Sequence, residues 1–246
     1  MEPEVSVVIP AYNCRGTLRE AVDSALCQGV EIEIIIIDDC SPEDLSDILA
    51  EYKENPQVRI FKNETNMGVA ETRNLGVTLS KGEFIAFLDA DDIWKPYKLE
   101  KQLALMKKTG AVLCSTAREI MEEDGTLTSK VINVPERITY KKLLYGNVIN
   151  CSSVLVKRDV ALEFPMTGDD VHEDYICWLN ILKKYNFAVA INEPLLLYRK
   201  TKNSKSGSKL HSAKMTYGVY KKMGFRTPKA FCCFVGYVIH GIIKYS

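Results

Sequence analysis

Short β-branched runs alternate with helical spacing along the first part of the chain. Runs that end at a proline, an aspartate or a turn predict buried strands at residues 5–9, 33–37, 58–61 and 83–88. Between them, apolar spacing and start signals predict helices over residues 17–28, from Ser41, Pro42 and Asp44 onward, and from the 66–68 turn to about Leu79. Strands and helices that alternate over short links are typical of a parallel sheet with helices on both faces.

The second part of the chain is less regular. We predict helices over residues 97–108, 172–185, 209–223 and 229–244, strands over residues 111–115, 153–156, 188–191 and 195–198, a hairpin turn at 123–125, and a flexible loop or linker at 201–208. No internal repeat is visible.

Polar clusters follow three of the predicted strands, at residues 10–13, 38–41 and 89–92. Ligands of parallel α/β sheets bind beyond the carboxyl ends of the strands. We therefore expect the three clusters to converge on one edge of the sheet and to form a binding site.

The composition is that of an ordinary globular protein, with 246 residues, 46% hydrophobic and 26% charged. This length fits one α/β domain, alone or with a helical appendage. The acidic N-terminus enters a strand at once, so we expect no secretory signal, and the apolar stretch 230–243 is short for a membrane span. The eight cysteines show neither CxxC pairs nor zinc-ligand spacing, which favours reduced, mostly buried thiols over disulfides.

A net charge of zero hides an uneven distribution. Lys and Arg total 32, as do Asp and Glu. No acid follows Glu193, whereas eleven bases do, so residues 1–193 hold 32 − 11 = 21 bases against 32 acids. The acidic body suits a divalent metal, and the basic, aromatic-rich tail suits an anionic membrane surface or a phosphate-rich ligand.

Asp89, Ala90 and Asp91 follow a buried strand. Carboxylate oxygens select Mg²⁺ or Mn²⁺, which in turn bind diphosphate, and a run of acids at the mouth of a sheet repels itself unless a cation is present. The alternative is a solvated turn. Asp38 and Asp39 end the adjacent strand, where a carboxylate could accept the N–H of a nucleobase. The alternative is a helix cap before Pro42, and one of the two could have that role alone.

Glu173 and Asp174 open a predicted helix. The helix dipole alone would favour acids there, but one of them could also serve as a general base that deprotonates an acceptor hydroxyl. Trp178 lies on the same helical face as Asp174, either in the core or as the wall of an acceptor pocket.

Tyr12, with the backbone of Pro10 and Ala11, could flank the nucleobase, or Tyr12 could belong to the core or its rim.

A basic segment follows the last predicted strand. Arg199 and Lys200, with Lys202 and Lys205, are either solvated or close over a diphosphate leaving group.

Motifs for several other enzyme classes are missing: GxGxxG, GxxxxGK[ST] and GxSxG do not occur, which disfavours a usual dinucleotide-binding fold, a P-loop NTPase and an α/β serine hydrolase.

Five segments, taken in order, resemble the family 2 inverting glycosyltransferases. They are VSVVIPAYN, IIIIDDCS, NMGVAETRNLG, FIAFLDADD with Trp94 and Pro96, and HEDYICWL. The resemblance covers roughly residues 4–200 and is to bacterial enzymes that build capsule, O-antigen and teichuronic-type polysaccharides. It implies the GT-A nucleotide-diphospho-sugar fold, an α/β domain with a mixed, mostly parallel sheet and helices on both faces, here followed by a helical C-terminal tail.

The resemblance also implies roles for individual residues. Asp174 would be the catalytic base with Glu173 beside it, Asp91 would ligate the metal, and Asp89 would contact the ribose or a metal-bound water. Nucleotide-sugar binding would fall to Pro10, Ala11, Tyr12, Asp38, Asp39, Asn66, Gly68, Arg73, Asp89, Ala90, Arg199 and Lys202, with Asp39 at the uracil edge. Trp178 would meet the acceptor.

One position departs from the family pattern. Many relatives carry a histidine two residues after the Tyr-Arg pair, where this chain has Thr201 between Lys200 and Lys202. Lysine supplies charge without ligating a metal, so the third metal ligand stays open.

The implied activity is transfer of a hexose or N-acetylhexosamine from a nucleotide-diphospho-sugar, chiefly a UDP-sugar, to a saccharide hydroxyl with inversion, aided by Mn²⁺ or Mg²⁺. The acceptor is expected to be a polyprenyl-diphosphate-linked intermediate at the inner face of the bacterial membrane. We expect no nucleic-acid partner. Rival interpretations are a non-catalytic nucleotide-sugar-binding module and a sugar nucleotidyltransferase.

We expect a catalytic domain over residues 1–205, with a nucleotide-binding half to about residue 95 and an acceptor half from 96. Residues 206–246 form the predicted basic, helical tail. Its apolar residues and flanking lysines suit an interfacial helix on the membrane. The alternative is a helix packed on the catalytic domain or on a dimer partner, so a homodimer is left open.

Overall fold

The computed structural model describes residues 2–168, 170–201 and 209–245. The described strands form one ten-stranded sheet in the order β3-β2-β1-β4-β9-β6-β10-β5, with β7 paired to β6 and β8 to β10. The strands are β1 (Val5–Ala11), β2 (Ile32–Asp38), β3 (Val58–Lys62), β4 (Phe84–Phe87), β5 (Ile93–Trp94), β6 (Leu113–Met121), β7 (Leu127–Ile132), β8 (Arg137–Thr139), β9 (Leu155–Lys157) and β10 (Phe187–Arg199).

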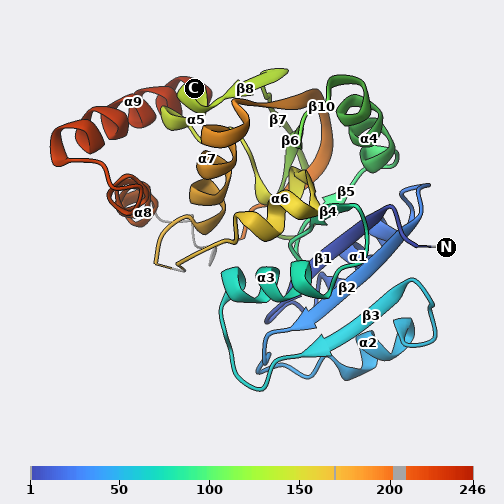
Figure 1. Cartoon of the computed structure of the whole chain (residues 1–246). Helices are drawn as coiled ribbons and strands as arrows, with labels where there is room; N and C mark the ends of the chain where they lie inside the picture. Colours follow the sequence, from blue (N-terminus) through green and yellow to red (C-terminus); the bar gives the residue numbers. More distant parts are fainter. Residues whose placement is uncertain (1, 169, 202–208, 246) are drawn as a thin grey trace.

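Helices cover both faces of this sheet (Figure 1). They are α1 (Leu18–Leu26), α2 (Ser46–Tyr52), α3 (Val69–Leu79), α4 (Lys98–Thr109), α5 (Tyr140–Leu144), α6 (Arg158–Glu163), α7 (Glu173–Tyr185), α8 (Lys209–Lys222) and α9 (Thr227–Tyr245), with a short 3₁₀ turn at Cys151–Ser153. The expected α/β fold with helices on both faces is confirmed.

Two hydrophobic clusters lie on opposite faces of the sheet because successive side chains of a strand point to opposite sides. In β1, Val7 and Ile9 pack with α1, α2 and α4, whereas Val8 packs with α3 and α5 to α9. In β4, Ala86 and Phe87 divide in the same way. The β-branched runs are therefore apolar on both sides, as expected for buried parallel strands.

The parallel pairing is concentrated in the first half of the sheet. Strands β3, β2, β1 and β4 are all parallel, so their carboxyl ends meet at one edge. Beyond β4, β9 is antiparallel to both β4 and β6, while β10 runs parallel to β6 and antiparallel to β5 and β8. The sheet is thus mixed, and the converging strand ends belong to its N-terminal half.

Two local predictions need correction. No helix begins at Ser41: its N–H donates to Asp38 Oδ1 at 2.8 Å, its hydroxyl accepts from the Asn13 N–H at 3.2 Å, and α2 begins only at Ser46. The two strands expected at residues 188–191 and 195–198 form the single strand β10, in which the register with β6 shifts around Pro194.

The C-terminal helices pack on the domain. Val219, Tyr220, Ala230 and Cys233 are buried in the same cluster as α5 and α7, and the Tyr220 hydroxyl donates to the Leu144 carbonyl at 2.8 Å. In Figure 1, α8 and α9 lie on the side of α7 that faces away from the sheet. The packed alternative for the tail therefore describes one face of α9. The part of the chain that the structure describes has no helix with the length and apolar character needed to span a membrane.

Candidate active site

The three polar clusters lie together at the carboxyl ends of the parallel strands, as predicted. Asp39, just after β2, donates its N–H to the carbonyl of Ala11 at the end of β1, at 2.9 Å. On the other side of β1, the Leu88 N–H donates to the Val8 carbonyl at 3.0 Å and leads the chain into Asp89. Adjacent parallel strands thus bring the clusters to one edge.

Asp39 organises the loop before α3. Its carboxylate accepts from Asn63 Nδ2 at 2.7 Å, from the Met67 N–H at 2.8 Å and from the Gly68 N–H at 2.9 Å. Gly68 has φ 85°, a left-handed conformation that suits glycine, and α3 begins at the next residue. Asn66 stabilises the same turn by accepting from the Gly68 N–H at 3.1 Å. The pattern ties the expected base-binding carboxylate to the loop that carries Asn66 and Gly68.

Asp38 does not cap a helix, because no helix begins at Ser41 and the N-cap residue of α2 is Leu45. It accepts from the Ser41 N–H and forms an ion pair with Lys62 at 3.0 Å. Burial alone would raise the pKa of Asp38, but these two partners outweigh it and lower the pKa. The carboxylate therefore holds the turn after β2.

Pro10, Ala11 and Tyr12 end β1 beside this turn. Ala11 is fully buried and Pro10 half-buried, while the Tyr12 side chain is 50% exposed. Of the two alternatives for Tyr12, a core position is excluded. A large exposed ring at a strand mouth is a suitable platform for a nucleobase.

Asp89, Asp91 and Asp92 share one tight turn after β4. The Asp92 N–H donates to the Asp89 carbonyl at 3.0 Å, and the Asp89 N–H donates to Ser152 Oγ at 3.1 Å. Burial, followed by the charge of Asp89, raises the pKa of Asp91 to about 6, and burial also raises the pKa of Asp92. Burial and mutual repulsion therefore oppose full ionisation of the carboxyl groups on this turn, which also includes the buried Ala90.

Arg73 joins the acidic turn to the start of α7. Its Nη2 donates to Asp89 Oδ1 at 2.5 Å and its Nη1 donates to Glu173 Oε1 at 2.9 Å. The side chain is nearly buried. Although burial opposes the charge, the nearby Asp89 helps to raise the pKa of Arg73 well above its ordinary value. Arg73 was expected to approach the donor, but the structure pairs it with two protein carboxylates.

Glu173 and Asp174 have different environments. Glu173 is 6% exposed and bound to Arg73, whereas Asp174 is half-buried and accepts the Tyr175 N–H at 2.7 Å. Burial and then the charge of Glu173 raise the pKa of Asp174 to about 7. A carboxylate with that pKa can accept a proton near neutral pH, so Asp174 fits a general base and Glu173 a positioning residue.

Arg199 is part of β10 rather than of a loop over the site. Its Nε donates to the Asp91 carbonyl at 2.9 Å, its N–H donates to Asp92 Oδ1 at 2.9 Å, and its Nη2 pairs with Glu20. The backbone N–H and the guanidinium of Arg199 thus both hold the acidic turn. Lys202 and Lys205 lie outside the described residues.

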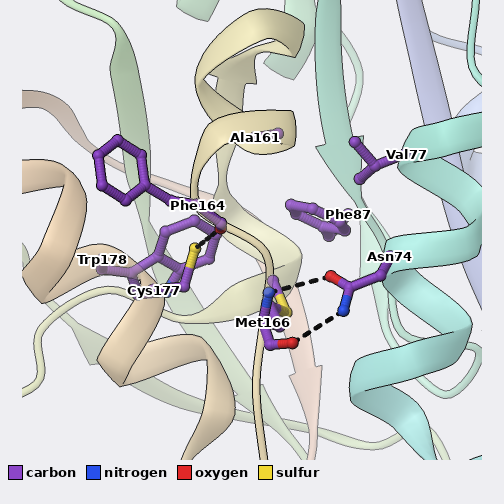
Figure 2. A pocket seen from close by; sticks show the side chains of 8 residues that line it. All are labelled: Asn74, Val77, Phe87, Ala161, Phe164, Met166, Cys177 and Trp178. Atoms are coloured by element: carbon purple, nitrogen blue, oxygen red, sulfur yellow. Dashed lines mark hydrogen bonds between the residues drawn. The ribbon is translucent and has the colours of Figure 1, made fainter.

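Trp178 is a core residue. Its side chain is 1% exposed and its ring packs against Phe87, with 6.1 Å between ring centroids. Figure 2 shows it beside a cavity of about 10 Å³, which is room for about one water molecule and far too little for a sugar. The expected acceptor contact of Trp178 is therefore wrong in this structure, and the core alternative holds.

Comparison with known proteins identifies the family. The profile of glycosyl transferase family 2 matches residues 6–162. The chain belongs to glycosyltransferase family 2.

Two glycosyltransferases are similar to this chain over nearly their whole length. The chain is 37% identical to a candidate teichuronic acid biosynthesis glycosyltransferase, TuaG of Bacillus subtilis (strain 168), over 99% of this chain and 98% of the relative. It is 36% identical to the UDP-Glc:alpha-D-GlcNAc-diphosphoundecaprenol beta-1,3-glucosyltransferase WfaP of Escherichia coli, over 98% of this chain and 95% of the relative.

Solved structures share the GT-A fold of this family 2 chain. TarS of S. aureus (residues 1–349), in complex with UDP-GlcNAc, superposes with a TM-score of 0.73 at 16% identity, covering 97% of this chain and 72% of TarS. The mannosyltransferase PcManGT of Pyrobaculum calidifontis, in complex with GDP-Man and Mn²⁺, superposes with a TM-score of 0.70 at 15% identity, covering 96% and 69%. The expected fold is confirmed.

The acidic turn of this family 2 chain has the right chemistry for a divalent metal. Among the described residues no three Asp, Glu, His or Cys side chains gather into a metal-binding group. Mg²⁺-type sites are commonly built from one or two carboxylates completed by substrate phosphates. Asp91 and Asp89 could supply hard oxygen ligands for such a site, and a cation there would favour the ionised form of Asp91.

Sequence reasoning missed two residues that hold the site together. Asn63 binds the Asp39 carboxylate, and Ser152 binds the Asp89 N–H. Asn63 directly follows β3, at the same edge of the sheet as the other clusters, so the strand-end rule could have found it. Ser152 lies in the 3₁₀ turn before β9, and its distance along the chain left no local signal.

Proposed function

We propose that this protein is an inverting glycosyltransferase. In this proposal it moves a hexose or N-acetylhexosamine from a nucleotide-diphospho-sugar, most simply a UDP-sugar, to a hydroxyl of a lipid-linked saccharide in bacterial surface polysaccharide synthesis. The observation that carries it is the Arg73 bridge, which holds the acidic turn at Asp89 close to the Glu173–Asp174 pair. The similarity to WfaP supports the choice of donor and acceptor class.

Donor binding would use the strand ends. Tyr12 would stack on the base, and the one acceptor site that the three partners of the Asp39 carboxylate leave would accept the N–H of the base. A Mn²⁺ or Mg²⁺ ion held by Asp91 and Asp89 would neutralise charge on the diphosphate. Arg73 would keep Asp89 oriented for this role.

The transfer would be a single displacement. The acceptor oxygen attacks the anomeric carbon from the side opposite the nucleotide, a new C–O bond forms, and the bond to the diphosphate breaks with its electron pair. Asp174 accepts the proton of the acceptor hydroxyl, and the nucleoside diphosphate leaves. Because attack and departure occur on opposite faces, the anomeric configuration inverts.

The proposed lipid-linked acceptor would place the enzyme at a membrane surface. A polyprenyl-diphosphate-linked saccharide is anchored in the bilayer, so the protein would work peripherally at the inner face of the bacterial cell membrane. The basic region after Glu193 supports this location, because it carries eleven bases and no acid.

The test is nucleotide release from a panel of nucleotide-sugars, with Mn²⁺ or with EDTA. We expect slow, metal-dependent UDP release from one donor by the wild type and by Asp159→Ala, an exposed control on α6. Asp91→Ala should abolish that release. Nucleotide binding without turnover, even with a lipid-linked acceptor present, would favour the non-catalytic module. Formation of a nucleotide-sugar from a nucleoside triphosphate and a sugar 1-phosphate, with release of pyrophosphate, would favour a nucleotidyltransferase.

A further inference from the structure

Helix α9 presents apolar side chains on two sides. Ala230 and Cys233 are buried against the domain. On the exposed side lie Phe231, Val235, Val238 and Ile239, which we call the α9 stripe, with exposed fractions of 59%, 39%, 40% and 53%. Their spacing of four, three and one residues places them on one face of the helix.

A helix packed against a protein on one side is normally polar on the other. Residues 230–243 contain no Asp, Glu, Lys or Arg. The α9 stripe is therefore an uncharged apolar surface on the outside of the molecule, a feature that in soluble domains marks a contact with another apolar phase or partner.

Exposed basic residues lie on α9 and on the elements packed beside it. Arg226 and Lys229 are exposed at the start of α9, and Lys221 is exposed at the end of α8. Helix α5 lies alongside, since a Cβ on Gly236 of α9 would come within 2.6 Å of the Tyr145 ring that follows α5. That helix adds two exposed lysines, Lys141 and Lys142.

We propose that the α9 stripe docks this protein on an anionic lipid membrane, with α9 parallel to the surface and the surrounding bases at the headgroups. A lipid surface offers an apolar layer for the α9 stripe and negative headgroups for the surrounding basic residues. A second copy of this chain is a poorer partner, because a symmetric contact would bring two basic rims together. The lipid-linked acceptor, on which the biological reason rests, belongs to the proposed function.

The docking surface is connected to the candidate base. Helix α8 contacts both α9 and α7. It also contacts the segment before Asp174: His172 Nε2 lies 3.3 Å from Ser212 Oγ, and Lys222 pairs with Asp170. The membrane-facing helices and the residues leading into α7 thus form one packed unit. An acceptor headgroup at the membrane would be presented on the side of the molecule where α7 begins.

The experiment is co-sedimentation of the full chain with vesicles. We would compare phosphatidylcholine vesicles with vesicles of phosphatidylcholine and phosphatidylglycerol, for the wild type, Val235→Glu/Ile239→Glu, and the control Leu162→Glu. Leu162 is equally apolar and 44% exposed, but lies on α6. Circular dichroism confirms folding, and the measurement needs no turnover, so it is independent of the proposed enzymatic activity.

We expect the wild type and Leu162→Glu to bind the anionic vesicles about tenfold more tightly than the neutral ones. The double variant should lose about tenfold or more of that binding while remaining folded. Equal binding by the double variant and the control would overturn the proposal. So would a wild-type dimer in light scattering that the double variant dissociates without any vesicle binding, because a second copy would then cover the stripe.

Discussion

Arg73 and Glu173 form a buried ion pair, with 2.9 Å between Nη1 and Oε1, although they are 100 residues apart in the sequence. The same guanidinium binds Asp89. The Arg73 guanidinium therefore joins two parts of the family 2 site. One is the acidic turn, which would bind the donor and the metal, and the other is the helix that carries the candidate base.

Removing the positive charge of Arg73 should destabilise the protein. Arg73→Gln takes the guanidinium away from the nearly buried Glu173, and breaking a buried ion pair costs about 3–5 kcal/mol. Urea unfolding measures the loss. Arg73→Gln/Glu173→Gln should recover part of it because the carboxylate of the broken ion pair is also gone, so a double variant that loses the sum of the two single effects would contradict the coupling.

Asp174 should control the pH dependence of transfer. Since its pKa is raised to about 7, the rate should rise with pH through about 7 as the carboxylate loses its proton. Asp174→Asn should lower the rate by about 10²–10⁴-fold. A pH profile of turnover for wild type and Asp159→Asn checks this, and an unchanged profile in Asp174→Asn would assign the base elsewhere.

The same group should influence stability in the opposite sense. An aspartate in the unfolded chain has a pKa of about 3.9, so between about pH 4 and pH 7 the folded protein holds a proton that the unfolded chain has released. The wild type should therefore lose stability relative to Asp174→Asn as the pH rises across this window. Denaturant unfolding of both proteins at several pH values measures the difference.

Gly82 should tolerate no side chain. A Cβ at this position would come within 2.7 Å of the Ser6 nitrogen and 2.8 Å of the Val5 carbonyl carbon, which are backbone atoms of β1. Gly82→Ala should cost about 1–3 kcal/mol in urea unfolding. Gly16→Ala is the control, because nothing lies within 4 Å of its Cβ, and it should change stability by less than about 0.5 kcal/mol.

The C-terminal helices should contribute to the stability of the whole domain. Tyr220→Phe removes a buried hydrogen bond to the Leu144 carbonyl and should lower the free energy of unfolding by about 0.5–1.5 kcal/mol. Tyr97→Phe, at a 61% exposed position, is the control and should leave the free energy of unfolding unchanged.

Deleting residues 226–246 should lower the melting temperature further, because it removes Ala230 and Cys233 from the core. Identical melting of the deletion and the full chain would contradict this packing.

Local pattern carried most of the secondary structure and failed at particular places. The ends of β1, β2 and β4 were predicted to within two residues because the apolar runs stop there, and the glycine turn before α3 was predicted too. The helix start at Ser41 was wrong because the capping signal was used by a turn to Asn13 and Asp38 instead. Trp178 was ambiguous because helical periodicity places a ring on a face without saying what covers it.

The α/β class and the basic character of the tail follow from the order of residues alone, because apolar periodicity and charge are properties of short segments. The edge where the acids gather follows as well, because parallel strands end on the same side of a sheet. Tertiary packing sets three further features: Arg73 binds Asp89 and Glu173, Arg199 holds the acidic turn, and one side of α9 is buried. Those outcomes depend on contacts between residues far apart in the chain, which form only when the helices pack on the sheet.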